Sequence, residues 1–342
     1  MTNQIRNLVV IGASAGGIKA ITKIIEGLSQ SMNAAYLVVL HVSRKSSASN
    51  IVEIFQRSTS LECIVAKDNL EIERGKIYLA PPENHLLVNG SVMRLNKGPE
   101  ENKYRPSIDV LFRSAAVHYG HRTVGVVITG MLEDGTSGMF AIKSCGGLCI
   151  VQDPSEAEYA DMPRNVMKRI KVDYMAELEE IPIVIENILN KPLPPKIAIP
   201  EEIRVEADLT EKLMSDINTL KKIADRSDFV CPDCGGGLWA IKNDPTHRYR
   251  CHTGHVYTEK LLQDLQDIKI EESIWVSIRI LEEKRTMLRL LISRNTRGEQ
   301  DSERNSVFAL EKRVQEIDEH IIRLKSLIVK LANNSEDESK SA

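Results

Sequence analysis

The chain has 342 residues, enough for one large domain and a smaller one. Its formal net charge is -3 and 4% of its residues are aromatic, which argues against a nucleic-acid-binding surface. No apolar run approaches the roughly 18 residues of a membrane span, and no basic segment followed by an apolar core marks a signal peptide. We therefore expect a cytoplasmic protein with no membrane span and no nucleic-acid partner.

The first predicted strand, 8–11, runs directly into a glycine-rich turn that contains Ser14, and helix-like sequence follows at 18–28. The pattern G-x-S-x-G at such a corner projects the serine hydroxyl beyond the end of a sheet, as in a nucleophile elbow. The same glycines also suit a phosphate-binding loop, which requires an acidic residue at the end of the next strand. That strand, 35–40, ends in His41 instead, which favours a hydrolase.

A third apolar strand, 123–129, leads into a turn that contains Asp134. Strands that alternate with helical stretches predict a doubly wound, mainly parallel α/β sheet, in which the carboxyl ends of the strands share one edge. Ser14, His41 and Asp134 would meet there as nucleophile, base and orienting carboxylate. Each residue also has an ordinary explanation, since Ser14 could cap a helix, His41 could be structural and Asp134 could belong to a plain turn.

The middle of this domain predicts an antiparallel hairpin added to the sheet. It involves the segments 76–80 and 86–95, with Asn89-Gly90 at the turn. The polar segment 96–105 that follows predicts a loop. A solvated connection is the ordinary interpretation of such a segment.

The cysteines form two groups. Cys63, Cys145 and Cys149 are scattered in the α/β part and are expected to be buried thiols. After a Pro-rich linker come Cys231, Cys234, Cys251 and His255, with a spacing that resembles a zinc ribbon. We expect these four residues to bind a structural zinc ion, with His252 as the second choice for the fourth ligand. A metal-free hairpin with a redox-active cysteine pair is the alternative.

From Glu259 onward the sequence predicts helices. One apolar stripe comprises Leu261, Leu265, Ile268, Trp275, Ile278 and Leu281. A second has steps of three and four residues and comprises Val307, Leu310, Val314, Ile317, Ile321, Leu324, Ile328 and Leu331. A polar stretch with Gly298 separates them, which predicts a helical hairpin. The stripes could pack within the chain, form a homodimer or bind a partner helix, and the sequence leaves these alternatives open.

Six segments together resemble the CheB family of chemotaxis protein-glutamate methylesterases. They are 11–17, the strand ending in His41, 79–85, 105–112, 130–135 and 151–164. The resemblance covers about residues 5–190 and implies that Ser14 is the nucleophile, His41 the general base and acid, and Asp134 the orienting carboxylate. It also implies an oxyanion hole that includes the backbone N–H of Met131, with Ala15, Gly130 and Arg105 as further oxyanion or substrate contacts. In the family the loop at 96–105 lies near the active site, so the resemblance implies either that Tyr104 and Arg105 contact the substrate or that the loop is a solvated connection. Two positions depart from the family pattern, because Ala15 stands where threonine is common and Leu132 where glycine is common.

The implied reaction is hydrolysis of glutamate γ-methyl esters on a chemoreceptor or a similar helical signalling protein. Ser14 would form an acyl-enzyme and release methanol, and the same route would deamidate glutamine without a catalytic cofactor. The chain resembles receiver-less family members that carry a C-terminal extension, so we expect no phosphorylation switch within it. A non-catalytic signalling scaffold, whose zinc-ribbon and helical tail binds a partner protein, is the alternative function.

The expected organisation has five parts. They are a methylesterase catalytic domain at 1–190, a Pro-rich linker at 191–200, a helix with the zinc-ribbon-like module at 201–258, a helical hairpin at 259–333 and a disordered tail at 334–342.

Overall fold

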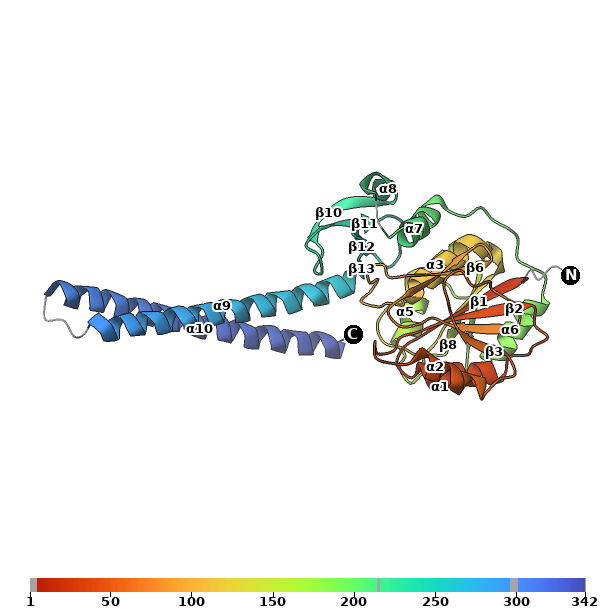
Figure 1. The fold of residues 1–342 in the computed structure, drawn as a ribbon, viewed down its shortest axis with the longest axis horizontal. Coiled ribbons are helices and arrows are strands. Elements are labelled where there is room, and N and C mark those ends of the chain that lie inside the picture. Colours follow the sequence, from red (N-terminus) through yellow and green to blue (C-terminus); the bar gives the residue numbers. More distant parts are fainter. Residues whose placement is uncertain (1–4, 214–215, 296–300, 342) are drawn as a thin grey trace. The chain divides into compact units, whose positions relative to one another are not determined.

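The computed structural model describes residues 5–213, 216–295 and 301–341 (Figure 1). The chain separates into two units, 1–261 and 262–342. The first is built on a seven-stranded sheet with the order β3-β4-β2-β1-β7-β8-β9, and each neighbouring pair is parallel. Its strands are β1 (Asn7–Ala13), β2 (Ala34–Leu40), β3 (Glu62–Val65), β4 (Lys76–Leu79), β7 (Thr123–Val127), β8 (Leu148–Gln152) and β9 (Tyr174–Ala176). The predicted parallel α/β sheet is confirmed.

The central strands β1 and β2 are apolar on both faces and completely buried, as expected for the middle of a parallel sheet. Three helices cover one face: α1 (Gly17–Glu26), α2 (Ala48–Gln56) and α6 (Ile181–Asn190). Three others cover the opposite face: α3 (Ile108–Tyr119), α4 (Thr136–Ser144) and α5 (Asp161–Arg169). A short 3-10 helix, Gly120–Arg122, follows α3.

Strand β1 lies at the point where the topology changes direction. From β1 the chain proceeds to β2 and β4 on one side, and it later returns to β7 on the other side. In register, Ala13 pairs with Leu40 and Gly12 with Val127, so the strand ends are level. The crevice at such a switch point is where open α/β sheets bind ligands.

The predicted hairpin is present and turns at Asn89-Gly90. Its strands β5 (His85–Asn89) and β6 (Val92–Asn96) pair only with each other as a sheet, whereas β4 joins the main sheet in parallel. Residues 192–200 contain no helix or strand. Cys63, Cys145 and Cys149 are buried free thiols.

A second, antiparallel sheet follows in the same unit, with the order β10-β11-β12-β13. Its strands are β10 (Ala224–Val230), β11 (Gly237–Ile241), β12 (Arg248–Cys251) and β13 (Val256–Thr258). Two helices, α7 (Glu201–Glu211) and α8 (Ile217–Ile223), precede the sheet in the chain. We call residues 224–258 the Cys/His module.

A buried ion network joins this module to the α/β part. Glu206 on α7 accepts hydrogen bonds from Arg248 of β12 at 2.9 Å and forms an ion pair with Arg113 of α3 at 3.1 Å. Glu101 accepts from Arg113 at 2.8 and 2.9 Å and from Arg250 at 3.1 Å. Burial alone raises the pKa of Glu101, but attraction to Arg113, and then to Arg250 and Arg248, holds it well below the ordinary value.

Glu101→Gln should lower the free energy of unfolding by about 3–5 kcal/mol near neutral pH, because it leaves buried guanidinium groups without a counter-charge. Since the folded-state pKa of Glu101 is depressed, its contribution is full above the ordinary value of 4.5 and is lost as the pH falls towards the folded-state value. Urea unfolding of both proteins across this range measures the difference. Glu62→Gln, which removes an exposed ion pair with Lys76, is the control and should change little. A pH-independent difference would contradict the argument.

The second unit is a helical hairpin, as predicted. Helix α9 (Glu259–Asn295) begins in the first unit, and α10 (Asp301–Ser341) pairs with it. Their shared core comprises Ile274, Ile278, Leu281, Leu288, Ile317, Ile321, Leu324 and Ile328. The two helices are also joined by hydrogen bonds from Arg285 to Asp318 at 2.6 Å and from Lys325 to Glu282 at 3.1 Å. The stripes therefore pack against each other within the chain.

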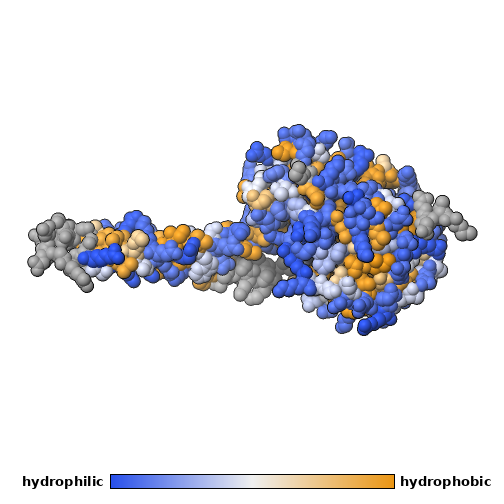
Figure 2. Space-filling view, in the orientation of Figure 1, coloured by the Kyte–Doolittle hydropathy of each residue, from blue (hydrophilic) through white to orange (hydrophobic). Residues whose placement is uncertain are grey.

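Two details differ from the expectations for the C-terminal part. Ile268 and Trp275 are about half exposed, at 51% and 49%, so neither lies on the buried stripe, and Ile274 packs there instead. Helix α10 extends to Ser341, beyond the boundary at 333 that the sequence predicts for the hairpin. Gly298 lies outside the described residues. Figure 2 shows apolar side chains on the outer surface of the hairpin. Met287 and Phe308 are exposed, at 66% and 70%.

None of the helices that the structure describes combines the length and the apolar character needed to cross a bilayer.

Candidate active site

Ser14 occupies a tight corner between β1 and α1. Its backbone N–H donates to the carbonyl of Thr129 at 3.0 Å, and its carbonyl accepts from Gly17 N–H at 2.9 Å. Gly16 caps the helix with φ of +74°, a left-handed conformation that favours glycine. At Gly17 a Cβ would lie 2.5 Å from the Leu40 side chain, so only glycine lets α1 approach β2 this closely. The corner fixes Ser14 beside the ends of β2 and β7.

His41 and Asp134 meet at the same edge of the sheet. The His41 N–H donates to Ala13 at the end of β1 at 3.0 Å, and its ring Nε2 lies 2.9 Å from Asp134 Oδ2. Both side chains are almost fully buried, at 4% and 0% exposed. A nitrogen bonded to a carboxylate carries the proton, so Nδ1 of the neutral ring is the unprotonated nitrogen.

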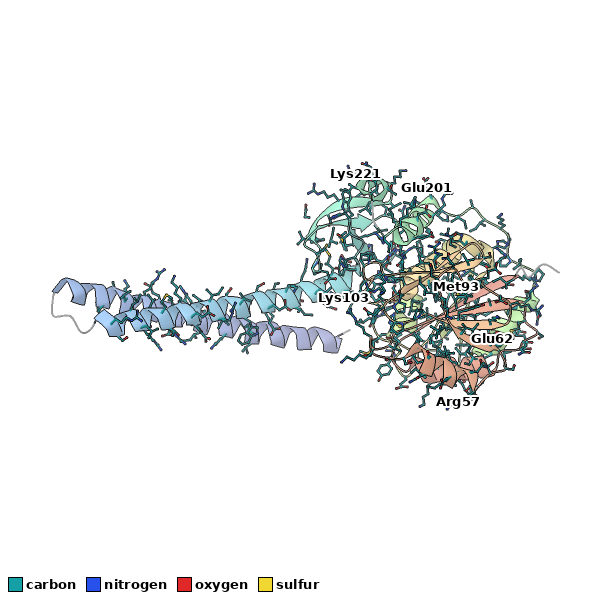
Figure 3. The ribbon with its side chains drawn as sticks, in the orientation of Figure 1. Arg57, Glu62, Met93, Lys103, Glu201 and Lys221 are labelled. Carbon is teal, nitrogen blue, oxygen red and sulfur yellow. The ribbon has the colours of Figure 1, made fainter. Side chains whose placement is uncertain are left out.

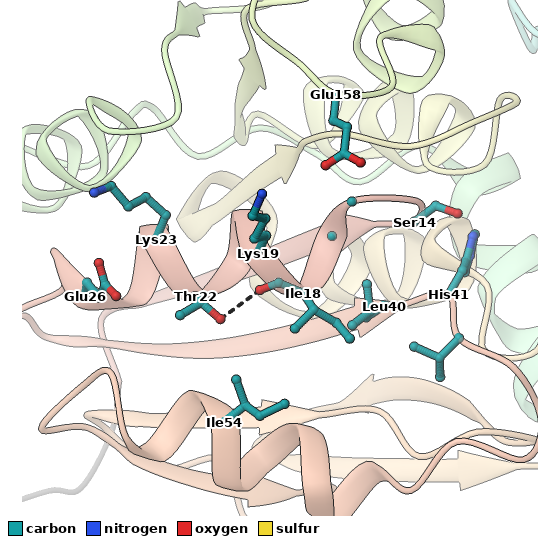
Figure 4. Close-up of a pocket in the computed structure, with 13 residues that line it drawn as sticks. Ser14, Ile18, Lys19, Thr22, Lys23, Glu26, Leu40, His41, Ile54 and Glu158 are labelled. Carbon is teal, nitrogen blue, oxygen red and sulfur yellow. Dashed lines mark hydrogen bonds between the residues drawn. The ribbon is translucent and has the colours of Figure 1, made fainter.

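The second ring nitrogen of His41, Nδ1, is buried and has no partner among the described residues. Figure 4 shows the Ser14 hydroxyl directed towards His41 at one end of a groove. Contacts between a nucleophile and its base tighten when substrate binds. The structure therefore brings together the three residues that the sequence singled out and leaves Nδ1 of His41 without a partner in the part of the chain that the structure describes.

Asp134 is held by donors on both carboxylate oxygens. Oδ2 accepts from His41 and from the backbone N–H of Ile108 at 2.7 Å. Oδ1 accepts from the Ser107 hydroxyl at 2.9 Å, from Asn102 Nδ2 at 3.2 Å and from Asp109 N–H at 3.3 Å. Burial alone raises the pKa of Asp134, but the hydrogen bond and charge of His41, and then the N–H of Ile108, outweigh burial and lower it. Asp134 is therefore ionised at neutral pH.

A second buried carboxyl group, Asp109, lies next to Asp134. Its Oδ1 accepts from Gly135 N–H at 3.0 Å and Gly138 N–H at 2.6 Å, and its Oδ2 accepts from Asn102 at 2.9 Å. Burial, followed by the negative charge of Asp134, raises the pKa of Asp109 well above the ordinary value. Asn102 thus bridges two carboxyl groups of which Asp134 is the more acidic.

The segment 96–105 is not a solvated loop. Glu101 and Asn102 are 1% and 4% exposed. The Tyr104 ring stacks on His41 with centroids 3.6 Å apart and planes 8° from parallel. Burial and then the charge of Asp134 raise the pKa of Tyr104, while a hydrogen bond with Ser14 opposes this rise. Tyr104 therefore covers one face of the imidazole with a neutral phenol.

Two backbone N–H groups are available close to Ser14. Within the described residues, neither Ala15 N–H nor Met131 N–H donates to a protein acceptor. Gly130 N–H, by contrast, donates to Tyr159 at 2.9 Å. Gly130 has a steric role, because a Cβ there would lie 2.8 Å from the Ser14 Cβ and 2.0 Å from Met162 Sδ.

Leu132 adopts φ of +68°, in the left-handed region that costs a non-glycine residue on the order of 1–2 kcal/mol. Leu132→Gly should raise the free energy of unfolding, by up to about 1 kcal/mol after the entropy of the unfolded glycine is deducted. Denaturant titration measures this. Ile183→Gly, at an exposed position in α6, is the control and should be destabilising. Loss of stability in both variants would contradict strain at Leu132.

A groove of about 770 Å³ begins at Ser14 and His41 and follows α1. Figure 4 shows Glu158 on one side of it and Ile54 of α2 on the other. Ile18 and Ile54 are exposed within it, and Lys19 and Lys23 add positive charge along α1. The remaining lining residues are Gly16, Gly17, Thr22, Glu26, Leu40 and Val42. Arg105 is held elsewhere, because it donates to Gly98 O at 2.9 Å and to Glu83 at 3.1 Å.

Comparisons with known proteins show the family of this chain. The model of the CheB methylesterase family matches residues 9–185, just over half of the chain. This chain belongs to the CheB methylesterase family. The enzyme class expected from the sequence is therefore confirmed.

Individual CheB relatives show the extent of the match. A curated relative from Leptospira interrogans is 38% identical over 174 residues, which cover 51% of this chain and 90% of the relative. The protein-glutamate methylesterase/protein-glutamine glutaminase 2 of Anaeromyxobacter dehalogenans is 34% identical over 181 residues, or 53% of each protein. The crystal structure of the Thermotoga maritima CheB methylesterase catalytic domain is 30% identical with a TM-score of 0.50, and the match covers 53% of this chain and 97% of that one. The chain thus spans nearly all of some relatives and about half of others.

Outside the part that matches the CheB family model, four side chains form a candidate metal centre. The ligand atoms of Cys231, Cys234, Cys251 and His255 all lie within 4.8 Å of one another. The Cys234–Cys251 sulfur separation is 3.8 Å, and His255 Nδ1 lies 3.7 Å from Cys231 Sγ and 3.6 Å from Cys251 Sγ. The edge of a tetrahedron with metal–ligand bonds of about 2.3 Å is roughly 3.7 Å. The group can therefore hold a tetrahedral metal ion, and His252 is not part of it.

Several residues of this candidate site could not be predicted from the sequence. Ser107 and Asp109 lie in the segment 105–112, which carried part of the family resemblance but gave them no role. Asn102 had no signal beyond the polarity of its loop. Their positions depend on the packing of that loop against α3 and α4, which local sequence does not encode.

Proposed function

We propose that this chain hydrolyses γ-methyl esters of glutamate side chains on methylated chemoreceptors or similar helical signalling proteins. Glutamine deamidation would follow the same route. The observation that carries the proposal is the convergence of Ser14, His41 and Asp134 at the ends of β1, β2 and the β7 loop, with His41 bonded to Asp134. The names of the curated relatives support the same chemistry.

In the first half-reaction, Ser14 Oγ attacks the ester carbonyl and its proton passes to His41 Nδ1. Asp134 stabilises the imidazolium through Nε2, and Tyr104 keeps the ring in place by stacking. The free N–H groups of Ala15 and Met131 are the proposed donors to the oxyanion. His41 then returns the proton to the departing methoxide, which leaves as methanol.

In the second half-reaction, water attacks the acyl-enzyme and His41 again accepts a proton. Collapse of the tetrahedral intermediate breaks the acyl–Oγ bond, His41 returns the proton to Ser14, and glutamate is released. Glutamine would enter by the same attack and release ammonia. All groups in this mechanism are supplied by the chain, and no catalytic cofactor is involved.

The groove along α1 is the proposed substrate channel. Helix α1 has 10 residues and is therefore about 15 Å long, which suits several turns of a receptor helix or a stretch of extended chain. Ile18 and Ile54 would contact apolar side chains of the substrate. The groove also carries charges of both signs, from Lys19, Lys23, Glu26 and Glu158, which would contact polar side chains of the substrate.

Structural zinc is the proposed occupant of the Cys/His site. Three thiolates and one imidazole form a closed tetrahedral set typical of structural zinc. The sulfur–sulfur separation of 3.8 Å and the sulfur–nitrogen separations of 3.6 and 3.7 Å are compatible with that geometry. Zinc binding would contribute to the folding of this small module.

The helical hairpin is the proposed partner-binding part, while residues 1–190 carry catalysis. Apolar side chains on its outer surface, including Met287, Phe308 and Ile322, are 66–70% exposed and could pack against a second copy or a partner helix. Sedimentation of the full chain with and without Phe308→Glu and Ile322→Glu tests dimerisation.

Trapping of the nucleophile tests the proposed function. A fluorophosphonate should modify Ser14, as located by peptide mapping, and should stop methanol release from a methylated receptor in proportion to labelling. Glutamine-containing receptor should release ammonia from the same preparation. A non-catalytic scaffold would bind its partner but release neither product, and that result would refute the proposal.

A further inference from the structure

Residues next to the candidate metal ligands hold the inner loop of the active site. Asp233, between Cys231 and Cys234, pairs with Lys103 at 2.5 Å. Arg250, before Cys251, pairs with Glu101 at 3.1 Å. Val256, after His255, accepts from Asn102 N–H at 2.8 Å and bridges to Glu101. The consecutive loop residues Glu101, Asn102 and Lys103 are therefore each held by a residue adjacent in sequence to a candidate metal ligand. Lys103 is labelled in Figure 3.

The inner side of the same loop shapes the catalytic groups. Asn102 Nδ2 bonds to Asp134 at 3.2 Å and to Asp109 at 2.9 Å. Tyr104 stacks on His41, and its N–H donates to Glu101 O at 3.0 Å. One short segment thus contacts the Cys/His module on its outer side and the acid and base on its inner side.

This loop conformation needs support from outside the segment. Asn102 and Lys103 have φ of +54° and +67°, and two successive left-handed residues without glycine are intrinsically unfavourable. Glu101 is buried and requires the guanidinium groups that surround it. The contacts from Asp233, Arg250 and Val256 supply part of that support.

We propose that the Cys/His module positions the active-site loop, so that metal binding at Cys231, Cys234, Cys251 and His255 holds Asn102 against Asp134 and Tyr104 against His41. This inference rests on the proposed esterase function for its kinetic consequence only. Asn102 and the module are positioning elements, because they act through Asp134 and His41. Metal occupancy would then control turnover through a segment far from the ligands in sequence.

Hydrogen exchange and kinetics of the full-length protein, with zinc bound and after removal by a chelator, test the inference. Zinc removal should increase exchange at the amides of Asn102 and Tyr104, while the amides of β1 and β2 stay protected. It should lower kcat by on the order of ten- to a hundredfold with little change in KM, the usual effect of losing an outer-shell support. Re-addition of zinc should restore both. Unchanged protection of 98–105 in metal-free protein would overturn the proposal.

Variants separate positioning from general stability. If metal binding holds the loop, the loop must in turn hold the metal site, because the coupling between the two is reciprocal. Lys103→Ala should therefore speed zinc release to a chromogenic chelator several-fold, and Lys103→Arg should restore the slow rate. Lys242→Ala is the matched control, since it breaks a lysine–aspartate pair with Asp225 inside the module. Equal zinc release from all three variants would refute the coupling. Failure of fluorophosphonate labelling in the zinc-bound protein would instead refute the esterase proposal and leave the exchange result standing.

Discussion

Ser14→Ala should lower kcat for methanol release by about 10⁴- to 10⁶-fold, because the acyl-enzyme cannot form without the hydroxyl. Binding of methylated receptor should change little. The fold should persist, since the two hydrogen bonds that fix the corner use the backbone N–H and carbonyl of residue 14. Single-turnover methanol release measures the effect.

Ser31→Ala is the matched control for this experiment. Ser31 is exposed and precedes β2, at the edge of the sheet opposite the candidate site. It should retain full turnover. Without the nucleophile, only the oxyanion hole and substrate binding would accelerate the reaction, and their contribution is far smaller than the rate of the intact enzyme. A Ser14→Ala enzyme that keeps more than about a hundredth of the native kcat would therefore contradict covalent catalysis at Ser14.

Asp134→Asn should lower kcat by on the order of 10⁴-fold. The substitution removes the negative charge that stabilises the imidazolium of His41. In the native protein Ile108 N–H donates to one carboxylate oxygen and Asp109 N–H to the other. Because an amide has only one oxygen, its NH2 group would face one of these two N–H donors and could not accept from it. An amide nitrogen facing His41 would favour the tautomer protonated on Nδ1, which cannot accept the Ser14 proton.

Circular dichroism and a denaturant titration of the variant distinguish this effect from misfolding. A native spectrum and an unchanged unfolding midpoint, together with the large fall in kcat, would place the loss in the chemistry at His41. Asp228→Asn, at an exposed site on β10, is the control and should leave kcat and the spectrum unchanged. If Asp134→Asn retained the full kcat, Asp134 would not be the orienting carboxylate of the mechanism.

Local sequence was sufficient to predict most of the α/β fold. Continuous apolar runs marked β1 and β2 as central parallel strands, and the Asn89-Gly90 turn marked the hairpin. The placement of Ser14 and His41 directly after their strands predicted that they would share an edge. Heptad-like spacing likewise predicted the seam of α10, although Ile274 rather than Trp275 completes it on α9.

The surroundings of the site were not predictable in this way. The segment 96–105 is polar, which usually indicates solvent exposure, yet Glu101 and Asn102 are buried because arginines of α3 and β12 and the carboxyl groups of the active site surround them. These partners are up to 149 positions apart in sequence. Their charges compensate only after folding has brought them together.

The sequence by itself determined the strand–turn–helix corners, the residue types at their tips and the spacing of the Cys/His ligands, because each depends on neighbours a few positions away. Only the tertiary structure decided which nitrogen of His41 faces Asp134, which backbone N–H groups remain free, and that the Cys/His module contacts the active-site loop. Those features arise from pairing and burial between distant segments, where the desolvation of each polar group must be balanced by a partner that local sequence cannot specify.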